Sequence, residues 1–246
     1  MNTSNSQEHY NEFFDTFFSH DWSIYSQKIY ELDSKEVLGS ELLLRVGDDG
    51  NFLDNSLFFP GICEDSRYLD VSSEMLNLVK NRFTHNPESF FEKTFINISP
   101  NEMRNKSVFL LLKELGNLFK ESNKRIVIEL SEIFTAEDFV DLRETLDKLC
   151  SNHIELAIDD YGKGLLDRQS FKNINLSYLK IDKSISDQIK INNDLVNDII
   201  EYCKENGILS IAEGIESRKI ENLLHSHGVR LGQGFYFHKP EFFVKF

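Results

Sequence analysis

Short apolar runs in this sequence end in, or contain, polar side chains of kinds that bind metal ions or move protons. The runs are ELLL (41–44), FIN (95–97), IVIE (126–129), LAIDD (156–160), YLKI (178–181) and SIAE (210–213). Their polar members are Glu41, Asn97, Glu129, Asp159, Asp160, Lys180 and Glu213. Oxygen donors without clustered Cys or His favour Mg²⁺, Mn²⁺ or Ca²⁺ over zinc. Because crowded carboxylates repel one another, we expect positive charge among them.

Each of these residues, taken alone, has a simpler explanation. A single acid at a strand end is usually a helix cap or one half of a surface ion pair. The segment Asp160–Gly164 by itself could form a tight turn, and Glu216 could complement the dipole of a following helix. The recurrence of polar groups on successive runs is what favours one shared site.

The elements that would position these residues alternate along the chain. Strands are predicted at Ser23–Leu32, Glu36–Val46, Thr94–Ile98, Arg125–Leu130, Glu155–Asp159, Tyr178–Ile181, Leu209–Ala212 and Gly234–Phe237. Helices are predicted at Leu69–Phe83, Glu102–Lys120, Ala136–Leu149, Leu165–Asn173, Asp187–Asn206 and Ser217–His227. Only Asp33–Lys35 separates the first two strands, which is hairpin spacing. We therefore expect a TIM-like (β/α)8 barrel whose opening strand is antiparallel, with the polar residues gathered at the carboxyl ends of the strands.

Length and composition agree with one globular barrel. The chain has 246 residues, 40% of them hydrophobic, and a formal charge of −14. No apolar run approaches the ~20 residues that span a bilayer, and the start has no secretory pattern. The three separated cysteines predict neither a disulfide framework nor a zinc motif, so a cytoplasmic location is expected. The acidic excess argues against binding to duplex nucleic acid or to an anionic membrane surface.

Residues 1–20 are predicted to form an N-terminal extension, a short helix, ahead of a barrel domain at residues 21–246. Phe13, Phe14, Phe17 and Phe18 recur there at helical spacing. Two interpretations remain open: a helix that caps the barrel, or an exposed aromatic stripe that serves a partner or a second subunit.

Strand alternation sorts the second run into two faces. Glu41, Leu43 and Arg45 share one face, so a Glu41 that points into the barrel mouth brings Arg45 to the same side. Arg45 can then bind a phosphate as a bidentate donor. Leu42 and Leu44 are expected to face the helices instead.

Seven segments in order make the sequence resemble a known family. They are ELLLRV (41–46), INIS (96–99), IELSE (128–132), AIDDYGKG (157–164), YLKID (178–182), IAEGIES (211–217) and GQGFYFHKP (232–240). Together they resemble the EAL domain, the bacterial cyclic di-GMP phosphodiesterase family. The resemblance implies a barrel with one antiparallel strand. It also implies two-metal hydrolysis of cyclic di-GMP to linear pGpG, with Mg²⁺ or Mn²⁺ as the two ions and a homodimer as one option.

The resemblance also implies roles for individual residues. The implied metal ligands are Glu41, Asn97, Glu129, Asp159, Asp160 and Glu213, with Asp159 bridging both ions. Lys180 matches the lysine that holds the attacking water, and Glu213 shares the catalytic centre. Arg45, Leu43 and Gln233 match substrate-binding positions. Glu132 matches a loop-stabilising glutamate, and Glu216 matches a supporting position.

Three departures from the family pattern leave an alternative open. Leu42 replaces the alanine of the name motif, which therefore reads Glu-Leu-Leu, and its outward face predicts a packing adjustment. Lys163 replaces a usual threonine and Leu165–Asp167 replaces Tyr-Ser-Ser in the loop after the paired aspartates. A new cation beside Asp160 can compete with metal. The alternative is therefore a module of low or no activity that binds cyclic di-GMP or a protein partner.

Overall fold

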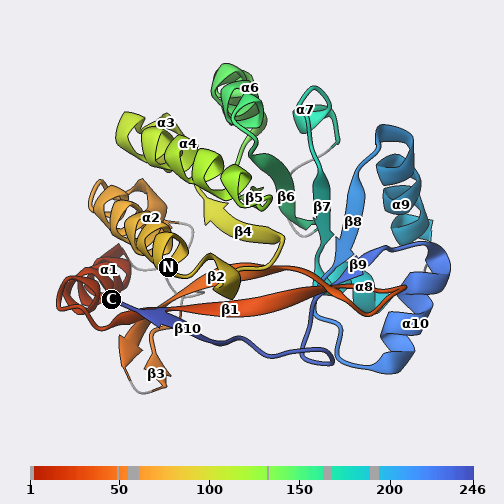
Figure 1. Ribbon diagram of the computed structural model, residues 1–246, viewed down its shortest axis with the longest axis horizontal. Helices are drawn as coiled ribbons and strands as arrows, with labels where there is room; N and C mark the ends of the chain where they lie inside the picture. Colours follow the sequence, from red (N-terminus) through yellow and green to blue (C-terminus); the bar gives the residue numbers. More distant parts are fainter. Residues whose placement is uncertain (1–2, 49, 55–60, 132, 163–167, 189–193) are drawn as a thin grey trace.

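A closed eight-stranded barrel forms the centre of the computed structural model, which describes residues 3–48, 50–54, 61–131, 133–162, 168–188 and 194–246 (Figure 1). The strands are β1 (Trp22–Glu31), β2 (Val37–Asp48), β3 (Asn51–Phe52), β4 (Lys93–Ile98), β5 (Arg125–Leu130), β6 (Glu155–Tyr161), β7 (Tyr178–Ile181), β8 (Leu209–Ala212), β9 (Leu231–Gly232) and β10 (Glu241–Lys245). Their order is β10-β1-β9-β8-β7-β6-β5-β4-β2-β3, and a further β1–β2 pairing closes the barrel. The predicted fold class is confirmed.

The opening strand runs against both of its neighbours in the barrel. β1 pairs antiparallel with β2 and with β9, whereas β2 and β4 to β9 pair parallel in turn. The Asp33–Lys35 turn is too short for a crossover helix, which is why the first pair is a hairpin. As a result, the start of β1, rather than its end, lies at the barrel mouth.

The helices cover the outside of the barrel (Figure 1). They are α1 (Thr3–Phe18), α2 (Tyr68–His85), α3 (Pro100–Arg104), α4 (Lys106–Glu121), α5 (Ala136–Asp141), α6 (Arg143–Ser151), α7 (Arg168–Phe171), α8 (Lys183–Gln188), α9 (Asp194–Asn206) and α10 (Arg218–His227). Two single turns of 3₁₀ helix lie at Gly61–Glu64 and Pro87–Ser89. No helix in these described ranges is long and apolar enough to cross a membrane.

Two apolar layers hold the barrel together. The outer layer joins helices to the outward strand faces and includes Leu42, which is 3% exposed, with Leu44 packed against it. The predicted outward direction of both leucines is therefore confirmed. Burying each such side chain stabilises the fold by about 1.5–3 kcal/mol. The inner layer fills the barrel and consists of Ile29, Phe95, Val127, Ala157, Tyr178, Ile211 and Leu231.

The N-terminal aromatic residues are mostly buried. Phe13, Phe14 and Phe17 are at most 1% exposed, and the Phe17 ring stacks on Trp22 with centroids 4.7 Å apart. The Arg67 guanidinium lies 4.1 Å from the centroid of the Phe14 ring, which ties α1 to the start of α2. Only Phe18 among the four is exposed, at 40%. The four phenylalanines of α1 therefore do not form an exposed aromatic stripe for a partner.

Several predicted elements have wrong bounds; the helix predicted at Ala136–Leu149, for example, is two helices, α5 and α6, that meet at Leu142. Residues Gly234–Phe237 form a turn, and the last barrel strand is Leu231–Gly232. The reason is a close backbone approach: a Cβ on Gly234 would lie 2.2 Å from the Ile215 nitrogen, and Tyr236 donates to the Ile215 carbonyl. The predicted helix at Glu102–Lys120 is two helices, because the Asn105 side chain accepts from Ser107 and Val108 and starts α4 anew.

Candidate active site

A ring of polar side chains lies directly above the inner apolar layer, toward the barrel mouth. Strand residues two apart point to the same side, so each residue two positions toward the mouth from an inner-layer residue also faces inward. Applied to Phe95, Val127, Ala157, Tyr178, Ile211 and Leu231, this rule gives Asn97, Glu129, Asp159, Lys180, Glu213 and Gln233. On the antiparallel β1 the rule runs backwards from Ile29 to Gln27, which pairs with Glu41 of β2. The fold thus brings together predicted residues that lie on, or directly after, seven strands, β2 and β4 to β9.

The Lys180 ammonium group lies at the centre of this ring. Its Nζ is 2.7 Å from Glu129 Oε1, 2.9 Å from Asp159 Oδ1, 2.9 Å from Glu213 Oε1 and 3.3 Å from Glu41 Oε2. The Lys180 side chain is 1% exposed and that of Glu129 is fully buried. One buried cation therefore faces four carboxylates from four other strands.

The pKa values reflect this excess of negative charge. Burial raises the pKa of Glu129 well above its ordinary value, and the charges of Glu41 and Asp159 add to the rise. Burial also raises the pKa of Glu213, to about 8. Burial alone would depress the pKa of Lys180, but the surrounding carboxylates raise it well above its ordinary value. A divalent cation bound here would compete with protons for the carboxylates of Glu129 and Glu213.

Glu41 differs from the other carboxylates because it is the best supplied with hydrogen-bond donors. Its Oε2 accepts from Gln233 at 2.7 Å and its Oε1 accepts from Asn97 at 3.1 Å. Burial favours the protonated form, but Lys180 and these donors outweigh it, so the pKa of Glu41 lies below its ordinary value. Glu41 is therefore an anion held in one orientation.

Asp159 and Asp160 both reach the site although they are consecutive. Adjacent residues of a regular strand point to opposite faces. Here the pairing of β6 with β7 shifts register between Ile158 and Tyr161, and Asp160 has a φ of 52°. This β-bulge redirects the second carboxylate. One oxygen each of Asp159, Asp160 and Glu213 then lie within 4.8 Å of one another.

This donor set fits divalent metal ions. It offers carboxylates and one amide, the oxygen donors that Mg²⁺ and Mn²⁺ prefer, and Asn97 lies at the exposed rim. The Asn97 amide nitrogen donates to Glu41 at 3.1 Å and to Glu129 at 3.0 Å. Ligation through the Asn97 oxygen would therefore require the amide to turn toward the ion.

The remaining predicted residues lie around this centre. Arg45 is half-buried, donates to the Leu44 carbonyl at 3.0 Å, and has a pKa lowered by burial and partly restored by the charge of Glu41. Leu43, on the same face of β2, pairs with Tyr25 of β1. Glu216 forms an ion pair with Lys183 and is 56% exposed, away from the buried centre. Glu132, Lys163 and Leu165–Asp167 lie outside the described residues.

Sequence reasoning missed Gln27. Its Oε1 accepts from Gln233 at 2.9 Å, so it belongs to the same hydrogen-bonded ring. The signal was present in the sequence: once the hairpin is predicted, Gln27 stands opposite Glu41 on the same face.

A cavity of about 560 Å³ opens between the segments that follow β4 and β5. Ser99 and Asn101 line it from the N-cap and first turn of α3, which follows β4, and Thr135 and Asp138 line it from the loop and helix after β5. These segments follow the strands that carry Asn97 and Glu129. The cavity therefore lies at the carboxyl end of the barrel, as the carboxylates do.

Comparison with known proteins places the chain in a family. Residues 13–240 match the model of the EAL domain. The chain is 26% identical over 234 residues to the probable cyclic di-GMP phosphodiesterase PdeB of Escherichia coli (strain K12), covering 92% of this chain and 44% of that protein. It is 27% identical over 229 residues to the cyclic di-GMP phosphodiesterase PdeA of Borreliella burgdorferi, covering 89% of this chain and 34% of that protein. The chain thus spans less than half the length of these relatives.

Solved structures share the fold at low sequence identity. The EAL enzyme Bd1971, in its cAMP- and cyclic-di-GMP-bound form, superposes with a TM-score of 0.80 at 24% identity over 96% of this chain and 66% of that one. The PaMucR phosphodiesterase in complex with c-di-GMP gives a TM-score of 0.78 at 17% identity over 95% of this chain and 97% of that one. The family match covers most of the sequence and agrees with the barrel and its antiparallel first strand. The chain belongs to the EAL domain family.

Proposed function

We propose that this protein is a metal-dependent phosphodiesterase that opens cyclic di-GMP to linear pGpG. The single observation that carries the proposal is the oxygen-donor cluster around Lys180 at the barrel mouth, in an EAL domain. Relatives with this domain are named cyclic di-GMP phosphodiesterases. Glu41, Asn97, Glu129 and Asp159 would hold one ion. Asp159, Asp160 and Glu213 would hold the second.

When bound, two divalent ions supply an activated water and offset the negative charge of the phosphodiester. Without them the site is acidic and unfavourable for a dianionic nucleotide. With them, and with Lys180 and Arg45, the mouth becomes locally attractive to phosphate despite the net charge of −14.

The chain's own residues then have distinct tasks. Lys180, held by carboxylates on four strands, would orient the attacking water and offset charge that develops on the phosphate oxygens. Arg45, half-buried on the face of Glu41, would hold a phosphate oxygen pair as a bidentate donor.

The proposal is tested by incubating the protein with cyclic di-GMP and Mg²⁺ or Mn²⁺ and separating the products. We expect pGpG from the wild type and at least a hundredfold lower rate for Glu41→Ala, since outer-sphere partners alone account for about 10–100-fold. Glu114→Ala is a matched control, because Glu114 forms an exposed ion pair with Lys80 on the helical surface. Tight binding of the nucleotide without pGpG, with either ion, would instead favour the non-hydrolysing binding module.

A further inference from the structure

Two buried glutamine amides connect the C-terminal segment to the Glu41 carboxylate. Gln27 Nε2 donates to the His238 carbonyl at 3.1 Å, and Gln27 Oε1 accepts from Gln233 Nε2 at 2.9 Å. Gln233 Nε2 also donates to Glu41 Oε2 at 2.7 Å. Gln27 is 9% exposed and Gln233 is 4% exposed. The four groups form one continuous hydrogen-bonded chain from the barrel wall to the carboxylate.

The direction of this chain is fixed by its two ends. A backbone carbonyl and a carboxylate can only accept hydrogen bonds, whereas an amide side chain both donates and accepts. If either glutamine turned over, oxygen would face oxygen at one end or nitrogen would face nitrogen between them. Gln27 and Glu41 therefore both require the Nε2 group of Gln233, and Gln27 holds that group toward Glu41 from the other side.

One side-chain oxygen in this series of hydrogen bonds has no hydrogen-bond partner among the described residues. A purely structural role for the two glutamines does not explain that. Gln233 Oε1 is buried and lacks a hydrogen bond within the described part of the chain. Both N–H groups of Gln233 are already used, so the amide cannot turn to satisfy this oxygen without losing Glu41. A buried unpaired acceptor is costly in general. Here the orientation of Gln233 that leaves its oxygen unpaired is the one in which its N–H group donates to Glu41.

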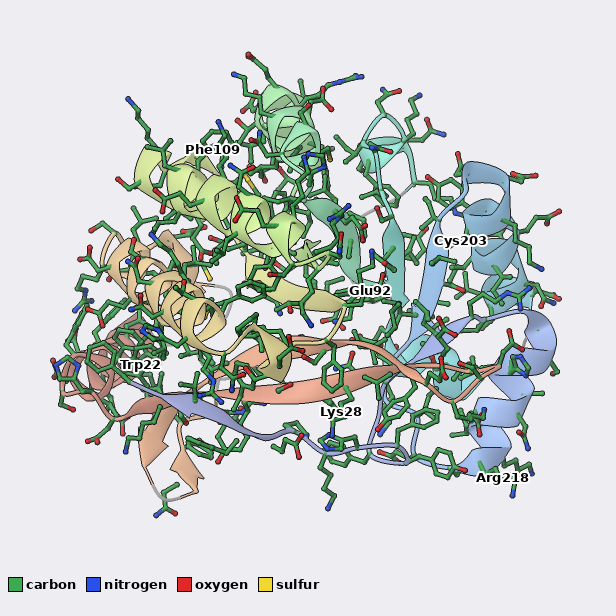
Figure 2. All side chains as sticks on the ribbon, in the orientation of Figure 1. Trp22, Lys28, Glu92, Phe109, Cys203 and Arg218 are labelled. Carbon is green, nitrogen blue, oxygen red and sulfur yellow. The ribbon has the colours of Figure 1, made fainter. Side chains whose placement is uncertain are left out.

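The outer end of the chain is anchored on the other face of β1. Lys28, the neighbour of Gln27, points outward from β1 toward the segment that leads into β10 (Figure 2). Lys28 Nζ lies 3.2 Å from His238 Nε2 and 3.1 Å from Glu241, and His238 Nε2 lies 3.1 Å from Glu241. This cluster holds His238, and hence the carbonyl that orients Gln27.

From this geometry we infer that Gln27 is a positioning residue for Glu41, acting through Gln233. The inference rests on the proposed function, in which Glu41 is a metal ligand. Gln27→Met keeps the length of the side chain but removes both hydrogen bonds. Gln233 then keeps only Glu41 as a partner for its side-chain N–H groups, so its amide is less firmly held and donates to Glu41 for only part of the time. We expect the affinity for divalent metal to fall about 10–100-fold, the usual effect of losing a partner of a metal ligand.

The test is calorimetric titration of the intact protein with Mn²⁺ alone, without nucleotide, for the wild type, Gln27→Met, Gln233→Met and the double variant. We expect a raised Kd for each single variant and a double variant no weaker than Gln233→Met, because both changes interrupt one chain. In the hydrolysis assay, Gln27→Met should need more Mn²⁺ for half-maximal rate and recover at saturating Mn²⁺. Gln169→Met is the control, since Gln169 is exposed and its side-chain oxygen accepts from Lys172 at 2.8 Å on the surface.

Three results would decide against the inference. Wild-type Mn²⁺ affinity in Gln27→Met overturns it, and so does an effect that adds in full to that of Gln233→Met. A wild type that binds no Mn²⁺ overturns both the inference and the proposed function. A wild type that binds Mn²⁺ but leaves cyclic di-GMP intact overturns the proposed activity alone, and the Kd comparison still decides the role of Gln27. Gln27→Leu replaces Gln27→Met if the methionine variant does not fold.

Discussion

Replacing Lys180 with methionine removes the one cation that lies among four carboxylates. The Lys180 side chain is 1% exposed and its Nζ is within 3.3 Å of all four groups. Breaking a buried ion pair from one side costs about 3–5 kcal/mol. At about 2–4 °C per kcal/mol for a chain of this length, Lys180→Met should lower the Tm of the metal-free protein by about 6–20 °C.

The loss should depend on pH in a defined direction. Burial already raises the pKa of Glu129 and of Glu213, the latter from 4.5 to about 8, and removing the ammonium raises both further. A carboxyl group whose pKa is raised in the folded state binds more protons there than in the unfolded state. The stability that it contributes is therefore present at low pH and is lost as pH rises through the folded-state pKa. The difference in Tm between wild type and variant should therefore grow from about pH 7 to about pH 9, because Glu213, whose pKa is about 8 in the wild type, ionises there in the wild type but stays protonated in the variant.

The assay is thermal unfolding in EDTA across that pH range, repeated with Mn²⁺. A divalent ion replaces part of the lost charge, so Mn²⁺ should raise the Tm of Lys180→Met more than that of the wild type. Lys80→Met is the control: Lys80 pairs with Glu114 at the surface, and its loss should cost at most about 1 kcal/mol. Two results would refute this expectation. One is an equal Tm for Lys180→Met and Lys80→Met in EDTA; the other is a Tm difference between Lys180→Met and the wild type that shrinks as pH rises.

Three further predictions concern the supports of the site. Burial raises the pKa of Glu102, so the wild type should lose stability relative to Glu102→Gln as pH rises above 4.5; parallel urea midpoints across pH would contradict this. Phe17→Ala should cost about 3–5 kcal/mol in urea unfolding because the ring is fully buried, whereas Phe18→Ala should cost much less. Equal losses for the two variants would show that α1 does not bury its aromatic face. Gly234→Ala should cost about 1–3 kcal/mol, since its Cβ would lie 2.2 Å from the Ile215 nitrogen. Wild-type stability of that variant would disprove the close approach.

The polar ring was largely predictable because strand periodicity is simple. Glu129 and Lys180 each follow an inward apolar residue by two positions, so an acid or lysine at that place stands out in an apolar run. Gln27 was missed because β1 runs antiparallel to the other strands of the barrel. On β1 the residue two positions toward the mouth precedes the inner-layer residue Ile29, whereas on the parallel strands it follows the inner-layer residue. Reading the hairpin backwards recovers it.

Other features depend on tertiary contacts that no local pattern carries. Phe235 and its aromatic neighbours have strand-like composition, but the backbone of Gly234 packs against Ile215 and turns the segment. The bulge that brings Asp160 beside Asp159 is likewise a property of how β6 pairs with β7. The break at Asn105 was locally encoded, since Asn is a strong N-cap, but the continuous apolar pattern of the helix obscured it.

In the proposed reaction the carboxylate ring binds divalent metal, and water opens a phosphodiester of the nucleotide. The most direct measurement is the mass of the product formed from cyclic di-GMP with Mn²⁺ in ¹⁸O-labelled water. We expect linear pGpG with a single ¹⁸O atom on its new terminal phosphate, no product in EDTA, and none from Asp160→Asn, which weakens the cluster of Asp159, Asp160 and Glu213. Intact cyclic di-GMP recovered from a protein that has bound both Mn²⁺ and the nucleotide would contradict the proposed reaction.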